Sequence, residues 1–305
     1  MDAGHRSNCS AAPAAAQLRT QRRTPSPRRT TAGRVRYAAA MFGLERPVSV
    51  DFVPDEDGRR FVAETFAHVA SALDDAAQAT FVGGEKIPPP RDLDELFEVV
   101  CATQARIGQQ DVEFSMVEMP EQGPPVPPGY APLGNPEGQL LHTFEKDGAY
   151  LMLLVPALFR VPQLVLASAA RELGRLALHH AGAVTTKDPD LVEAEAEIAA
   201  TALGLGTWVA NGAYVFENAC CGGGCGVDLS SIRAGLSMPE ACYALALFAH
   251  RRGLGRRAVA RPLAPTQKAA FKACYRHVAK HGPPAVPPAG PSASTDVPGQ
   301  RSPAA

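Results

Sequence analysis

The chain has 305 residues, of which 46% are hydrophobic and 20% charged, a composition that can bury one sizeable core. It has no apolar run of about 18 residues, which excludes a helix that crosses a bilayer, so we expect no membrane partner. The seven cysteines are an odd number, and no apolar segment follows the N-terminal arginine pairs. We therefore expect a cytoplasmic protein with reduced thiols and no disulfide framework.

Charge and composition divide the chain into three parts. Residues 1–42 are rich in Arg, Ser, Thr, Ala and Pro without apolar periodicity, residues 43–281 carry periodic apolar patterns, and residues 282–305 are rich in Pro, Ala and Ser. We expect a disordered basic arm, a single α+β domain and a disordered tail. The arm either contacts nucleic acid or an acidic partner through its arginines, or has no role, with Met41 as the real start. No aromatic residue precedes Tyr37 to stack on bases, which favours the second reading.

The first half of the domain alternates between the two periods of regular structure. Apolar residues at every second position predict strands, and apolar residues at steps of three and four predict helices. This gives a strand over 48–53, a helix over 58–77, a helix over 93–107 with Asp92 or Asp94 near its N-cap, and a strand over 111–119. Residues 120–136 hold too many prolines and glycines for a regular element and predict a surface loop.

The second half begins with a predicted hairpin and continues with helices. Strands over 138–145 and 149–156 meet at an Asp-Gly pair, a strong hairpin signal. Helices are then expected over 161–181 and 189–205, over a segment that Ser237 caps and Gly253 ends, and over a last segment that Thr266 caps. The expected fold is a small antiparallel sheet or hairpin packed by about five helices.

The helix over 161–181 contains Arg171-Glu172-Leu173-Gly174-Arg175. In a zincin helix, His-Glu-x-x-His places two zinc-binding histidines one turn apart, with the Glu as general base. Glu172 matches that base and Leu173-Gly174 matches the pair that often follows it. Arginines occupy both histidine positions, and a guanidinium has no lone pair to offer a metal.

The helix over 189–205 is acidic, with Glu193, Glu195 and Glu197. A hairpin, a Glu-Leu-Gly helix and an acidic helix in this order resemble the short zincin-like metallopeptidases. The resemblance covers residues 138–215 and implies a zincin-like core in which a Glu of the second helix is the third zinc ligand. Glu193 and Glu197 match by motif, whereas helical periodicity places Glu195 among apolar neighbours, so the choice stays open.

Three hypotheses account for the arginine pair. Arg171 and Arg175 could pair with Glu172 and one of the three glutamates at 193, 195 and 197, and so hold the two helices together. They could lie on a solvated face, or they could form an anion or ligand site. Spacing along the helix does not separate these readings.

A cysteine-rich loop offers the other candidate site. Cys220, Cys221 and Cys225 could converge on a zinc ion, but structural zinc takes four ligands, usually in two pairs. Cys274, His277 and His281 share one face of the last predicted helix and are the remaining cluster of metal-binding side chains. The alternative is that Cys274 belongs to the core and the loop thiols are free or paired.

These features favour a non-catalytic, zincin-like binding or structural module without a bound cofactor. The alternative is a metal-binding protein or hydrolase that uses the loop from Cys220 to Cys225 or another site. The sequence names no ligand, partner or oligomeric state.

Overall fold

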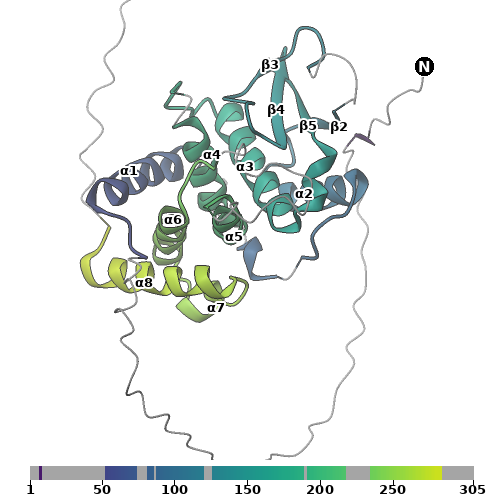
Figure 1. The fold of residues 1–305 in the computed structure, drawn as a ribbon. Helices are drawn as coiled ribbons and strands as arrows, with labels where there is room; N and C mark the ends of the chain where they lie inside the picture. The colour runs from purple at the N-terminus through teal and green to yellow at the C-terminus, as the bar shows by residue number, and fades with distance from the viewer. Residues whose placement is uncertain are drawn as a thin grey trace, which may run out of the picture.

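The computed structural model describes Ser7–Asn8 and residues 52–73, 81–85, 87–119, 126–188, 191–217 and 234–283. These residues form an α+β fold, as the sequence predicts, with a small sheet at one end and helices at the other (Figure 1). No helix among them is long and apolar enough to cross a membrane. The arm 1–42, apart from Ser7–Asn8, and the tail beyond residue 283 lie outside the described residues.

The sheet has the strand order β1-β2-β5-β4-β3. The strands are β1 (Ser7–Asn8), β2 (Phe114–Glu118), β3 (Ala131–Pro132), β4 (Leu141–Lys146) and β5 (Ala149–Leu154). β2 and β5 are parallel and the other pairs antiparallel. The expected antiparallel sheet is therefore a mixed one. The chain makes β4 after β2 and then returns, so that β5 lies between them and runs in the direction of β2.

The predicted hairpin forms β4 and β5, with Glu145 opposite Tyr150 and Lys146 opposite Ala149. Its turn residues, Asp147 and Gly148, both have positive φ, at 51° and 80°. This is the backbone that a two-residue turn needs and that Asp-Gly adopts readily. The hairpin has buried residues on both faces: Leu141 and Met152 join the main core, while Phe144 and Leu151 form a smaller cluster under residues 126–130.

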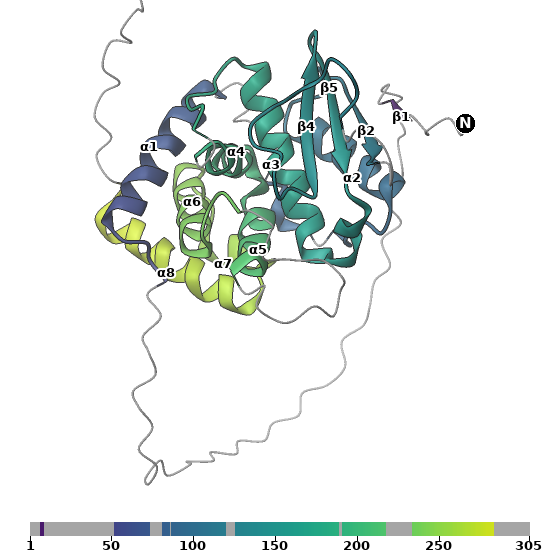
Figure 2. The same cartoon turned by 45° about the horizontal axis from the view of Figure 1, so that its top comes forward.

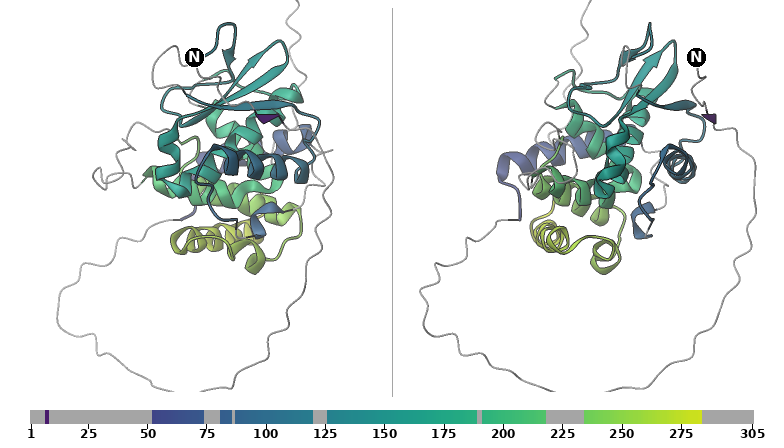
Figure 3. Two further views of the ribbon diagram at one scale, coloured as in Figure 1. Left: turned by 90° about the vertical axis from the view of Figure 1, so that its right-hand side faces the viewer. Right: turned by 45° about the vertical axis from the view of Figure 1, so that its right-hand side comes forward.

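The helices pack on one another beside the sheet, and α2 and α3 contact it (Figure 2). Their bounds are α1 (Glu56–Ala72), α2 (Leu93–Arg106), α3 (Pro162–His180), α4 (Val192–Ala200), α5 (Gly206–Glu217), α6 (Met238–Arg251), α7 (Arg256–Ala260) and α8 (Pro265–His281). α3 packs against β4, α4 and α5, and α6 packs against α1, α5 and α8. Figure 3 shows the sheet at one end and α7 and α8 at the opposite end, so α3 and α4 lie between the two.

Local signals account for most of the helix boundaries. The Asp92 carboxylate caps α2, and Ser237 and Glu240 form a reciprocal capping box at α6. α8 begins at Pro265, one residue before the expected Thr266 cap, because proline fits the first helical position.

Five features differ from the expectations. The α-helix expected over 189–205 ends at Ala200. A π-helical turn, Thr201–Leu205, connects it to α5, a helix that the sequence did not predict. Short β3 forms inside the segment expected to be a loop, and Ser7–Asn8 in the arm pair with β2. The strand expected over 48–53 is absent at Phe52 and Val53, and its other residues are not described. Cys242 and Cys274 form no disulfide, but Cys101 is disulfide-bonded, against the expectation of reduced thiols.

Candidate functional site: a buried Arg–Glu network

The site forms where α3 crosses α4 at very short range. A Cβ atom built on Gly174 would lie 2.2 Å from the carbonyl oxygen of Ala196 and 2.6 Å from the amide nitrogen of Ala200. Only a glycine permits this approach, because the groups it would meet belong to the backbone of α4 and cannot rotate away. The crossing brings one polar face of α3 directly against the acidic face of α4.

Both arginines are buried, Arg171 with 2% and Arg175 with 1% of its surface exposed. The solvated-face reading is therefore wrong. Arg175 Nη2 donates to Glu193 Oε2 at 2.7 Å, and Arg175 Nε donates to Glu172 Oε2 at 3.0 Å. Its Nη1 donates to the backbone carbonyl oxygen of Leu133 at 2.7 Å. The guanidinium thus joins α3, α4 and the segment before β4.

Glu172, the match to the zincin base, is fully buried and fully engaged. Its Oε2 accepts hydrogen bonds from the backbone nitrogen of Thr143 at 2.9 Å and from the Thr143 hydroxyl at 2.8 Å. Burial by itself would raise the pKa of Glu172, but the positive charges around it, that of Arg175 foremost, lower the pKa to about 2. A carboxylate held ionised in this way is a weak proton acceptor near neutral pH.

Arg171 links the same carboxylates to the far end of α4. Its Nε lies 3.3 Å from Glu172 Oε1 and 3.4 Å from Glu193 Oε2, and its Nη1 lies 3.7 Å from Glu197 Oε1. Glu197 also accepts from the backbone nitrogens of Gly235 and Leu236, at 3.2 and 2.8 Å, just before α6. Burial raises the pKa of Glu197, and Arg171 with these two donors opposes that shift.

The choice among the three glutamates of α4 follows from their direction. Glu193 and Glu197, one turn apart, face the arginines, whereas Glu195 faces away. Glu195 accepts from both the backbone nitrogen and the hydroxyl of Thr185 and so holds the loop before α4. Glu193 and Glu197 are thus the two glutamates of α4 that pair with the arginines, and the buried position expected for Glu195 is observed.

The segment over residues 131–139, here called the strap, covers this network. Leu133 pairs with Thr143 through its backbone nitrogen and accepts from Arg175 through its carbonyl oxygen. Gly134 has a φ of 97°, and a Cβ there would lie 2.3 Å from Arg175 Nη1. Gln139 Nε2 donates to Glu193 Oε2 at 3.4 Å. The strap therefore closes over the side of α3 that the zincin resemblance assigns to a catalytic cleft.

Sequence reasoning missed His142, which lies on β4 beside Thr143. Its side chain is buried, its ring meets Phe144 edge-on at 5.3 Å between centroids, and neither ring nitrogen has a hydrogen-bond partner among the described residues. Burial is the main cause that lowers the pKa of His142 to about 3, so the ring is neutral at physiological pH. The alternating pattern of β4 places His142 on the face opposite Thr143, but it does not show that other residues bury that face.

The other candidate ligands do not converge among the described residues. Cys274 is buried in the core, with its thiol directed at the carbonyl oxygens of Phe52 and Pro239, at 3.2 and 3.8 Å. The ring centroids of His277 and His281 lie 4.7 Å apart, with the ring planes tilted by 35°. Cys220, Cys221 and Cys225 lie outside the described residues. Within those residues no three His, Cys, Asp or Glu side chains are grouped as a metal site requires.

Comparisons with known proteins do not assign this network to a family. No family model, no curated protein and no solved structure matches the chain. The zinc ion that the resemblance implies does not fit the residues present, since guanidinium groups occupy both histidine positions and the carboxylates already neutralise them. The arrangement is built to satisfy charge, and it offers no lone-pair donors in a tetrahedral set.

Proposed function

We propose that this protein is a non-catalytic, zincin-like binding or structural module. In it, Arg171 and Arg175 hold α3 against α4 at the place where a zincin helix holds zinc. The observation that carries the proposal is the pairing of Arg175 with Glu193, which joins a ligand position of the motif to the candidate third ligand at 2.7 Å. The order of hairpin, Glu-Leu-Gly helix and acidic helix supports it.

The energetics of the network fit a structural role. Removing one member of a buried ion pair costs about 3–5 kcal/mol, because the other charge is left uncompensated. The network therefore favours one relative placement of α3, α4 and the strap over others, even where its net contribution to stability is small. Glu172 has no exposed surface, which argues against its acting as a base toward a substrate.

A peptidase assay tests the proposal. Purified protein with added Zn²⁺ is expected to hydrolyse no member of a fluorogenic peptide library, and Glu172→Gln is expected to change nothing in that assay. Glu98→Gln, at an exposed position of α2, is the matched control. Zinc-dependent hydrolysis by the wild type that Glu172→Gln abolishes and Glu98→Gln preserves would contradict the proposal.

A cytoplasmic location is part of the same proposal, and cell fractionation tests it. Disulfides are rare in the cytosol, so the disulfide at Cys101 argues against the cytoplasmic location. It does not bear on the proposed binding or structural role.

A further inference from the structure

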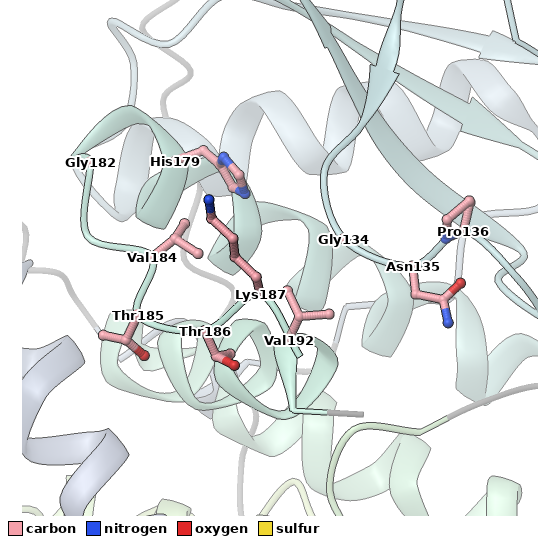
Figure 4. A pocket seen from close by; sticks show the side chains of 10 residues that line it. All are labelled: Gly134, Asn135, Pro136, His179, Gly182, Val184, Thr185, Thr186, Lys187 and Val192. Carbon is pink, nitrogen blue, oxygen red and sulfur yellow. The ribbon is translucent and has the colours of Figure 1, made fainter. Parts of the chain in front are cut away.

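A cavity of about 720 Å³ opens beside the ion-pair network (Figure 4). Its walls come from the end of α3, the loop over 182–187, the start of α4 and the strap residues 134–136. Small-molecule sites usually enclose about 300–1,000 Å³, so the volume suits a ligand of metabolite size. Arg175 lies directly behind the wall, because Gly134 separates it from the cavity.

Two nitrogen groups converge across this cavity. Figure 4 shows the Lys187 side chain extended toward the ring of His179. No carboxylate of the described residues lies within ion-pair distance of Lys187. An ammonium group without a protein counter-charge, directed into a cavity, has its charge available to a ligand.

The uncharged side chains of the wall add hydrogen-bond donors. The Asn135 carbonyl oxygen already accepts from the backbone nitrogen of Glu137, and the Thr186 hydroxyl oxygen accepts from that of Asp188. The groups left for a ligand are then mainly donors, namely the amide N–H bonds of Asn135 and the hydroxyl O–H of Thr186. With Lys187, the polar wall offers mostly donors.

The carboxylates near the cavity are buried and bonded through one oxygen each. Glu195 Oε1 accepts twice from Thr185 and Glu193 Oε2 accepts from Arg175, whereas the second oxygen of each is buried without a hydrogen-bond partner among the described residues. Burial is the main cause that lowers the pKa of His179, and the charge of Arg175 lowers it further. Glu195, Glu145 and Glu172 oppose this shift without reversing it. The His179 ring is therefore harder to protonate than an exposed histidine, and Lys187 carries the positive charge of this wall.

We infer that this cavity binds a small ligand through a compact anionic group, a carboxylate or a phosphate. Lys187 supplies the counter-charge, Asn135 and Thr186 donate hydrogen bonds, and His179 contacts the same group. This names a ligand class for the proposed binding module. It is separable from the ion-pair network, because Lys187 makes no contact with Arg171 or Arg175 among the interactions described.

Amide NMR titrations with inorganic phosphate and with acetate, at matched ionic strength, test the inference. One or both anions should shift the amide signals of Asn135, Thr186 and Lys187 in a saturable way, and the stronger of the two identifies the anionic group. Lys187→Met should weaken that binding at least fivefold, whereas Lys280→Met, at an exposed position of α8, should leave it unchanged.

Two results would overturn the inference: no saturable shift with either anion, or binding that Lys187→Met leaves as strong as in the wild type. Lys187 is exposed, so this variant should keep the fold, and a thermal melt equal to that of the wild type verifies it. Failure of the anion test with an unchanged melt would leave the proposed role of Arg171 and Arg175 standing.

Discussion

Replacing Gly174 by alanine should destabilise the protein, although the same change inside a helix normally stabilises it by about 1 kcal/mol. The new Cβ would lie 2.2 Å from the Ala196 carbonyl oxygen, so α4 must retreat by about 1 Å to restore ordinary contact. Overpacking of this kind costs about 1–3 kcal/mol. The retreat also stretches the 2.7 Å contact between Arg175 and Glu193, and a charge-assisted hydrogen bond contributes about 1.5–3 kcal/mol.

The net expectation for Gly174→Ala is a loss of about 2–4 kcal/mol, or a melting temperature lower by about 5–15 °C for a domain of this size. Urea unfolding followed by circular dichroism measures it. Gly255→Ala is the control, because no atom lies within 4 Å of a Cβ at that position and its φ is −67°. Its effect should stay below about 1 kcal/mol. A Gly174→Ala variant as stable as the wild type would refute the close crossing of α3 and α4.

Three further predictions concern the same network and His142 beside it. Thr143→Val removes the hydroxyl that donates to Glu172 at 2.8 Å and should cost about 1–2 kcal/mol in urea unfolding; no loss would show that the bond is not formed. Below pH 6.5 the unfolded chain protonates His142, but the folded protein, with a pKa of about 3, does not. The protonation of His142 in the unfolded chain should therefore lower the free energy of unfolding by about 2 kcal/mol between pH 7 and pH 5. His142→Phe should abolish this part of the pH dependence. Arg171→His with Arg175→His should bind one zinc ion per chain by elemental analysis, and the wild type none; a metal-free variant would contradict the zincin analogy.

The parts of the fold that local chemistry determines were predictable. Asp147 and Gly148 predict a turn with positive φ, and Ser237 and Glu240 predict a capping box. Each pattern lies within a few residues of the structure that it determines. The α+β class follows from the succession of such elements.

Elements that depend on distant partners were not predictable. α5 has a strongly apolar sequence without a clear polar stripe, so periodicity could not separate it from α4, and the break comes at Gly204 with a φ of 90°. β3 lies in a segment rich in proline and glycine, and it forms because β4 offers it a free edge. Neither circumstance can be derived from the residues concerned alone.

The polar face of α3 shows why a site can be found from sequence and still be misread. Arg171, Glu172 and Arg175 lie together by helical spacing, but that spacing is the same for a wet surface, a cleft or a buried network. The residues that cover this face decide among the three. Thr143 hydrogen-bonds to Glu172 from 29 residues away in the sequence, and the Leu133 carbonyl oxygen accepts from Arg175 from 42 residues away. Gly174, matched first as part of a motif, has the stronger physical role, because its missing side chain lets α4 approach. Two buried arginines require nearby carboxylates, so the acidic pattern of the next helix was the strongest signal in the sequence that this face lies inside the protein.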